Sequence, residues 1–217
     1  MKITRLFSAA DLESIREVTA SAESRTSGEI VPYIVERVVD RDEARWRGAA
    51  LGALTAALVA GLIHAAGGYW GGGGIVWITF PALLGAGLGF LIGGIDGVGR
   101  LLISRDHLEH FVRLRAEAAF LEEEVFNTRD RTGILVFIAL FEREAVILGD
   151  EGINRAVPEG LWQRLVDDLV AGISAGRPAE ALRETILACG ELLVEHDVTP
   201  RPDDENELAD APRITER

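Results

Sequence analysis

Charged residues are unevenly distributed along the chain, and the longest gap between them predicts a membrane segment. No Asp, Glu, Lys or Arg occurs from Gly48 to Ile95, although these residues make up 26% of the whole chain. Because a bilayer core of roughly 30 Å requires about 20 apolar residues in a helix, the gap accommodates two spans. We expect them at residues 48–68 and 75–95, as a transmembrane hairpin that interrupts a soluble domain.

The flanks of the hairpin predict its orientation. The loop between the spans contains Tyr69, Trp70 and four glycines, but no Lys or Arg. Since positive charge is retained on the cytoplasmic side, we expect both termini and the soluble domain in the cytoplasm. Glycine at positions 85, 89 and 93 favours close helix packing, either between the two spans or with a partner. The flanking arginines are Arg41, Arg45 and Arg47 before the first span, and Arg100 and Arg105 after the second.

Outside the hairpin, the periodicity of apolar residues predicts alternating helices and strands. Ser8 is expected to cap a first helix. Residues 29–39 are rich in β-branched side chains and predict a strand, in which Pro32 suggests an edge position or a bulge. Apolar residues recur at steps of three and four from Phe111 to Val125, which predicts an amphipathic helix.

The second half of the chain continues this alternation. Residues 132–142 are almost wholly apolar, as expected of a strand covered on both faces, and residues 144–150 follow after a short turn. The short gap requires these two strands to be antiparallel. A helix around Trp162 is expected to end at Gly176, and Pro178 to begin another. The order of elements predicts an α/β sandwich.

The expected domain organisation follows from these elements. Residues 1–45 and 100–198 form the two parts of the soluble domain, and residues 46–99 form the hairpin. Residues 199–217 are rich in proline and charge, so this tail is expected to wrap the surface or to be disordered. The amino terminus contains no apolar region of the secretory type, and we expect it to begin a helix.

Composition excludes some classes of partner. The net charge is −13, and the charge lies outside the hairpin, which argues against nucleic-acid binding. The single cysteine, Cys189, cannot form an intramolecular disulfide and is expected to be a small core residue.

Candidate chemistry depends on carboxylates. The chain has no Cys-x5-Arg loop, no Walker loop and no ligand spacing among its four histidines, so any catalysis would require acidic residues and a metal. Ca²⁺ and Mg²⁺ prefer oxygen ligands, and the predicted metal ligands are Glu29, Asp130, Asp150 and Glu151. No organic cofactor is expected, and no catalytic residue can be assigned.

The predicted topology decides whether these acids meet. The second strand begins and the third ends at the same edge, so Asp130 and Asp150 are expected to be neighbours. Glu29 shares that edge only if the first strand runs parallel to the second. The alternative is that Asp150 and Glu151 cap the next helix, and that Asp130 opens a tight turn before Gly133.

The order of motifs resembles a known family. "RTSGEIVPYIVE", the long stretch "TRDRTGILVFIALFEREAVILGDEGINRAVPEGLWQRLVDDLV", "ACGELLVEH" and "RPDDENELAD" are similar to the TPM domain family. The family is named after a thylakoid lumen protein, a photosystem II repair protein and a nematode receptor modulator. The chain most resembles its bacterial branch, which has an inserted transmembrane hairpin. The resemblance implies an α/β/α sandwich with a small mixed sheet.

The resemblance also implies three alternative functions. The first is a membrane-anchored cytoplasmic domain in the bacterial inner membrane that binds or regulates a membrane-protein partner, or associates with itself. The second is an acid-phosphatase-like hydrolase that depends on Ca²⁺ or Mg²⁺. The third is a calcium-binding module without catalysis. The sequence leaves open whether the protein is an enzyme.

Overall fold

The computed structural model describes residues 3–67, 74–203 and 206–215, and the chain forms two compact units. The first, called the α/β unit, comprises Met1–Val38 and Glu109–Arg217; the second, called the hairpin unit, comprises Val39–Leu108. The predicted loop with Tyr69 and Trp70 lies outside the described residues.

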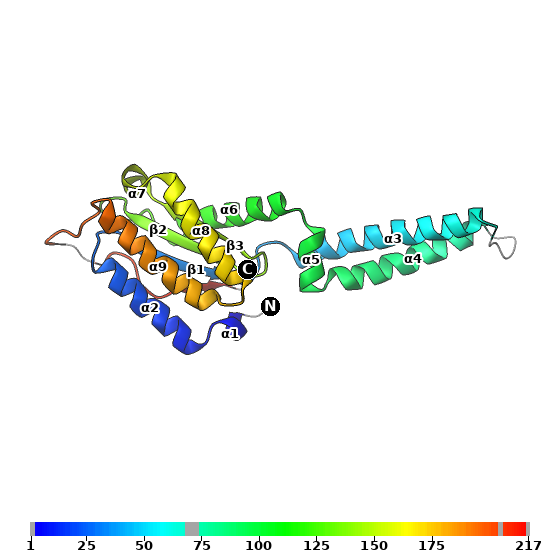
Figure 1. The fold of residues 1–217 in the computed structure, drawn as a ribbon, viewed down its shortest axis with the longest axis horizontal. Coiled ribbons are helices and arrows are strands. Elements are labelled where there is room, and N and C mark those ends of the chain that lie inside the picture. Colours follow the sequence, from blue (N-terminus) through cyan, green and yellow to red (C-terminus); the bar gives the residue numbers. More distant parts are fainter. Residues whose placement is uncertain (1–2, 68–73, 204–205, 216–217) are drawn as a thin grey trace. The chain divides into compact units, whose positions relative to one another are not determined.

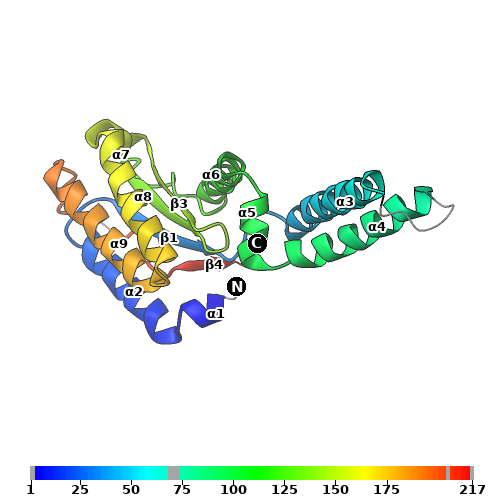
Figure 2. The ribbon, with the colours of Figure 1, turned by 45° about the vertical axis from the view of Figure 1, so that its right-hand side comes forward.

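The α/β unit is built on a mixed four-stranded sheet in the order β3-β2-β1-β4. β1 (Glu29–Val35) is parallel to β2 (Gly133–Ala139) and to β4 (Arg213–Thr215), whereas β2 is antiparallel to β3 (Glu144–Gly149). Figure 2 shows β4 beside β1 at the outer side of the sheet. The predicted mixed sheet and its antiparallel strand pair are therefore confirmed.

Helices cover both faces of this sheet, which confirms the α/β/α sandwich (Figures 1 and 2). Side chains alternate between the two faces along β2, and all seven of its residues are buried. Ile134, Val136 and Ile138 pack in the larger core, together with α2 (Ala9–Glu23), α8 (Glu159–Ser174) and α9 (Pro178–Glu195). Cys189 of α9 lies in this core, as expected.

The opposite face of the sheet is covered by α6 (Arg105–Glu122). The predicted apolar stripe on this helix was wrong in its details. Val112, Ala116 and Ala119 face the sheet and are fully buried, whereas Phe111, Leu114 and Leu121 are exposed. Alanine is small enough to let the helix approach the sheet closely, so the row with smaller side chains forms the core.

Pro32 does not mark a bulge, because β1 pairs with β2 in register along its whole length. It does occupy a local edge position, as predicted, because β4 pairs only with Tyr33–Val35. The nitrogen of Glu29 donates to Thr132 on the β2 side, and that of Glu36 donates to Thr215 on the β4 side. By alternation, the nitrogen of Pro32 lies on the β4 side. Proline is tolerated there because β4 begins only opposite Tyr33, so no ladder hydrogen bond is lost.

The polar tail is partly ordered as β4, a strand that the sequence did not predict. β4 pairs with Tyr33–Val35, and Arg213 donates to the carboxylate of Glu123 at 3.0 Å. The remaining helices of the α/β unit are the short α1 (Ile3–Leu6) and α7 (Glu151–Ala156). Ser8 caps α2 in a capping box with Asp11, as predicted for Ser8.

The hairpin unit contains α3 (Arg41–Ala65), α4 (Gly74–Gly93) and the short α5 (Asp96–Leu102). Among the described residues, Asp42–Ala65 and Ile75–Gly93 are long and apolar enough to span a membrane. A Cβ atom added to Gly89 would overlap the backbone oxygen of Gly48, and one added to Gly85 would overlap that of Gly52. The two helices therefore pack backbone against backbone, which requires glycine at these positions.

Candidate functional site

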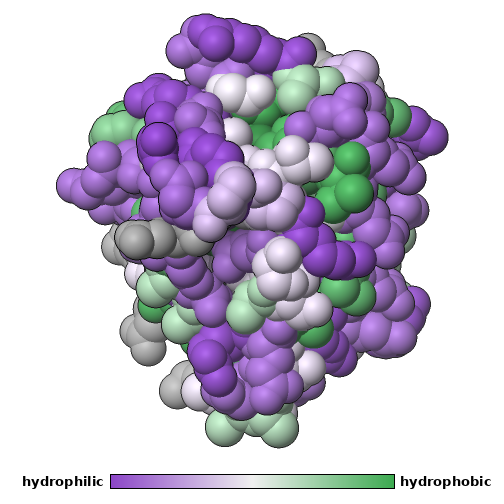
Figure 3. All heavy atoms as spheres, turned by 90° about the vertical axis from the view of Figure 1, so that its left-hand side faces the viewer, coloured by the Kyte–Doolittle hydropathy of each residue, from purple (hydrophilic) through white to green (hydrophobic). Residues whose placement is uncertain are grey.

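The predicted acidic residues lie at one end of the sheet, which we call the amino edge. It comprises the start of β1, the loop 128–132 before β2, the end of β3 and the tail segment 199–210. Because β1 is parallel to β2, Glu29 shares this edge with the loop and with Asp150. The amino edge lies at the left-hand end of the α/β unit in Figure 1 and faces the viewer in Figure 3, where hydrophilic residues predominate.

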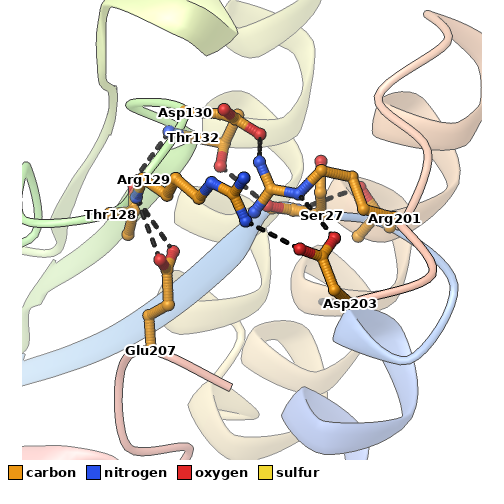
Figure 4. Close-up of polar contacts among 10 residues, drawn as sticks. Ser27, Thr128, Arg129, Asp130, Thr132, Arg201, Asp203 and Glu207 are labelled. Carbon is orange, nitrogen blue, oxygen red and sulfur yellow. Dashed lines mark hydrogen bonds and ion pairs between the residues drawn. The ribbon is translucent and has the colours of Figure 1, made fainter. Parts of the chain in front are cut away.

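The loop 128–132 has a defined conformation. The side-chain oxygen of Thr128 accepts from the nitrogen of Thr132 at 2.9 Å, and its carbonyl oxygen accepts from the nitrogen of Arg131 at 3.2 Å. Thr132 in turn donates from its hydroxyl to the carbonyl oxygen of Ser27 at 2.7 Å (Figure 4). The loop is thus tied to the segment that leads into β1, in agreement with the predicted turn before Gly133.

Asp130 and Arg129 connect this loop to the tail (Figure 4). The carboxylate of Asp130 accepts from Arg201, and Arg129 donates to Asp203 at 3.0 Å. The hydrogen bond from Arg129 lowers the pKa of Asp203. The backbone nitrogen of Arg129 also lies 3.0 and 3.1 Å from the two carboxylate oxygens of Glu207. The charges of the loop therefore bind the tail.

Asp150 is buried and caps α7, which is the structural alternative considered for it. Its Oδ1 accepts from the nitrogen of Glu151 at 2.7 Å, and the Nε of Arg131 lies 2.8 Å from its Oδ2. Glu151 pairs with Arg155 one helical turn away. Asp150 and Asp130 therefore lie on the same edge but pair with different arginines.

Gly152 is required by close approach of the loop rather than by a turn. Its nitrogen donates to the carbonyl oxygen of Arg131 at 2.9 Å, inside the first turn of α7. A Cβ atom at this position would overlap the carbonyl oxygens of Asp130 and Arg131. Glycine thus lets α7 pack directly against the loop 128–132.

Glu29 is buried, and its side chain binds backbone nitrogens of the tail. Its two carboxylate oxygens accept from the nitrogens of Glu207 and Leu208 at 3.2 and 3.4 Å. Burial raises the pKa of this carboxyl group, although the two hydrogen bonds oppose the shift. The carboxylate of Glu29 thus fixes the backbone of the tail at residues 207 and 208, before β4 begins.

Glu23, at the end of α2, was not predicted as part of the site. Its Oε1 accepts from the nitrogen of Ile30 at 2.7 Å, next to Glu29. Burial, together with the nearby charges of Glu29 and Asp210, raises the pKa of Glu23 to about 9. The sequence shows that Glu23 is an acid at the end of a predicted helix. It does not show that the fold buries this side chain, so Glu23 could not be assigned to the site.

Each predicted metal ligand already has a partner within the chain. Asp130, Asp150 and Glu151 pair with arginines, and Glu29 accepts from backbone nitrogens. Within residues 3–67, 74–203 and 206–215, no group of three His, Cys, Asp or Glu side chains is arranged to hold a metal ion. Binding of Ca²⁺ or Mg²⁺ stays a prediction, and the ion would have to displace an arginine from its carboxylate.

Comparison with known proteins identifies the domain that contains this edge. Residues 107–192 match the family model described as the TPM domain. The chain contains a TPM domain. The matched segment of the TPM domain runs from α6 to α9 and includes Asp130, Asp150 and Glu151, but not Glu29.

The fold of the chain is also known from a solved structure. The NMR structure of the BA42 protein from the psychrophilic bacterium Bizionia argentinensis is similar, with a TM-score of 0.60 over 99% of each chain. The sequence identity is 18%, so this likeness concerns the fold alone. No curated protein sequence matches the chain.

Proposed function

We propose that the protein is a membrane-anchored TPM domain that binds or regulates another membrane protein. The hairpin unit would place the α/β unit at the cytoplasmic face of a bacterial inner membrane. The surface of the hairpin helices is the observation that carries this proposal.

The hairpin helices expose their large apolar side chains. Leu58, Leu83 and Leu91 are each more than 60% exposed, while the contact between α3 and α4 runs through glycines. Only 11% of the apolar window of α3 and none of that of α4 is buried. The core helix of a soluble protein buries its apolar side chains, so these surfaces favour lipid as the surrounding medium.

Charge supports a cytoplasmic orientation. Arg45 and Arg47 lie near the start of α3, and Arg100 lies in α5, after α4. Arg47 pairs with Glu43 and donates to the carbonyl oxygen of Leu102. By the positive-inside rule this end stays in the cytoplasm, and two crossings return the chain to the same side.

Topology is tested with two reporters fused after Arg217 in the full chain. A reporter active only in the cytoplasm is expected to be active, and one active only outside is expected to be silent. Carbonate extraction should leave the protein in the membrane fraction. An active external reporter would overturn the orientation, and release by carbonate would overturn the membrane anchor.

Binding of a partner is tested by crosslinking in native membranes, followed by mass spectrometry. Crosslinks between the α/β unit and one other membrane protein are expected. A matched chain with Arg45, Arg47 and Arg100 replaced by serine tests whether orientation matters, since inversion would abolish these crosslinks. Recovery of self-crosslinks alone would count against a separate partner.

The calcium-binding and phosphatase alternatives depend on the carboxylates of the amino edge. Calorimetry with millimolar Ca²⁺ tests binding, and absence of heat would remove the calcium-binding alternative. Hydrolysis of a phosphomonoester with Mg²⁺ or Ca²⁺ that is lost in Asp150→Asn would support catalysis. Asn retains the capping oxygen for α7, so this variant separates the charge of Asp150 from its structural role.

A further inference from the structure

The exposed side of α6 carries a row of apolar side chains. Phe111, Leu114 and Leu121 lie along one side of the helix, at 39%, 47% and 64% exposure. Ala118, between them, is partly buried. The helix already uses a different row, with Val112 and Ala119, to cover the sheet. The second row is therefore not required by the core of the α/β unit.

This row ends in a groove between α6 and the end of β3. The groove has a volume of about 490 Å³, a size typical of sites that hold small ligands or a few side chains. Glu117, Phe120 and Leu121 of α6 line one side, and Leu148 and Gly149 of β3 line the other. Together with Glu151 at the start of α7, these residues define the α6–β3 groove.

The charged residues that line the groove are all acidic. Glu117, Asp150 and Glu151 line it, with Asp150 buried and paired with Arg131, and the lining itself includes no Lys or Arg. All four side chains of the pairs Glu117–Arg113 and Glu151–Arg155 are at least half exposed. These pairs therefore contribute little energy, and the acids can exchange their arginines for another cation. An apolar floor with an acidic rim suits a segment that carries both apolar and basic residues.

We propose that the α6–β3 groove binds a short cytoplasmic segment of a membrane protein, in which apolar residues alternate with Lys or Arg. This rests on the proposed function, because the loops of membrane proteins are enriched in Lys and Arg on the cytoplasmic side, where the α/β unit is expected. An apolar side chain of the segment lies against Phe120, Leu121 and Leu148, and a basic side chain approaches Glu117 or Glu151.

The proposal is tested with the full chain in phosphatidylcholine nanodiscs. The probe is a short fluorescein-labelled peptide of alternating leucine and lysine, and fluorescence anisotropy measures its dissociation constant after subtraction of empty nanodiscs. Leu121→Ser is expected to weaken binding about tenfold, because it removes the exposed apolar contact. Glu117→Gln is expected to weaken it about two- to threefold at low salt, and the effect should fall as salt rises.

Two matched variants on α9 serve as controls. Val194→Ser removes another exposed apolar side chain, and Glu180→Gln removes an acid that also pairs with a nearby arginine. Neither is expected to change the dissociation constant. Equal weakening by Leu121→Ser and Val194→Ser would overturn the proposal, as would equally tight binding of a peptide with glutamate in place of lysine.

A second copy of the chain is the main competing occupant. In Leu121→Cys the new thiol is exposed, whereas Cys189 is buried and burial raises its pKa to about 12. Disulfide crosslinking of Leu121→Cys to itself in native membranes would show that the groove binds a second copy and would overturn the proposal. The reporters after Arg217 report independently on orientation, so failure of the groove and failure of the proposed function are distinguishable.

Discussion

Large apolar side chains are mostly buried in the α/β unit and mostly exposed in the hairpin unit. Every residue of β2 from Gly133 to Ala139 is buried, and Phe137 stacks on Tyr33 within the core. In α4, by contrast, Phe80 is 61% exposed. The two units also differ in their helix contacts, since α2 and α9 share a core of side chains whereas α3 and α4 meet at glycines.

This difference, taken with the proposed membrane anchoring, assigns a different stabilising medium to each unit. Burial of apolar side chains away from water stabilises the α/β unit, and that contribution is present without a membrane. The hairpin unit buries little of its own apolar surface. On the proposed membrane anchoring, its stability would come from lipid and from close backbone packing. Substitutions of the same type should therefore have different effects in the two units.

The largest expected effect is a difference in stability between two Phe→Ala variants, one in each unit. Phe137→Ala removes a fully buried ring and should destabilise the α/β unit by about 3–5 kcal/mol. Phe80→Ala is the matched change on the hairpin unit, and it should leave the stability of the α/β unit unchanged. Hydrogen exchange of peptides from β2 and β3, in the full chain in nanodiscs, measures both. Comparable loss of protection in the two variants would contradict the division into separately stabilised units.

The next effect tests the backbone packing of the hairpin unit. Gly89→Leu should separate α3 from α4 at a cost of about 1–3 kcal/mol, because the new side chain overlaps the backbone at Gly48. Gly87→Leu is the control, since a Cβ atom there meets no other atom within 4 Å. Spin labels at positions 58 and 84 report the distance between the helices. The distance should lengthen only in Gly89→Leu, and equal distances in both variants would refute the packing role of Gly89.

A smaller effect concerns pH and the α/β unit alone. The pKa of Glu23 is raised to about 9 by burial, so the folded state holds a proton that the unfolded state releases near its ordinary value of 4.5. The contribution of Glu23 to the free energy of unfolding should therefore decrease as pH rises from about 4.5 to about 9, and level off above that. Glu23→Gln retains an oxygen for the nitrogen of Ile30 without the charge, and at pH 8 it should be more stable by about 1–2 kcal/mol.

The measurement is the difference in thermal midpoint between wild type and Glu23→Gln from pH 5 to pH 9. The difference should grow with pH, because the variant lacks the titrating group while all other groups are shared. Glu13→Gln, a change at an exposed acid of the same helix, is the control and should give a flat difference. A flat difference for Glu23→Gln would show that Glu23 is not protonated in the folded state.

The sequence predicted those features that depend on local pattern. The long apolar segments defined the hairpin, although α3 begins at Arg41, before the first predicted span, because Asp40 caps it. The apolar run before Gly149 predicted the antiparallel strands, and their register brought Asp130 and Asp150 to one edge. In each case neighbouring residues carried enough information.

Features that depend on distant partners were not predictable in this way. β4 is three residues long, with Ile214 as its only apolar residue, and it is ordered by pairing with β1. Asp130 pairs with Arg201, which lies 71 positions away, so the sequence could not show that a cation already occupies this carboxylate. The raised pKa of Glu23 likewise depends on burial in the folded unit and on the charges of Glu29 and Asp210.

The smallest expected effect tests whether these distant pairs hold the tail. Arg201→Ala removes the partner of Asp130 and should loosen the segment up to β4 at a cost below about 1 kcal/mol, because Asp130 is 47% exposed and solvent screens the pair. Arg177→Ala, which breaks an exposed pair with Glu180, is the control. Hydrogen exchange at residues 213–215 should quicken only in Arg201→Ala. Unchanged exchange would mean that β-pairing with β1 and the backbone hydrogen bonds to Glu29 suffice to order the tail, so that the α/β unit binds its last segment without help from charge.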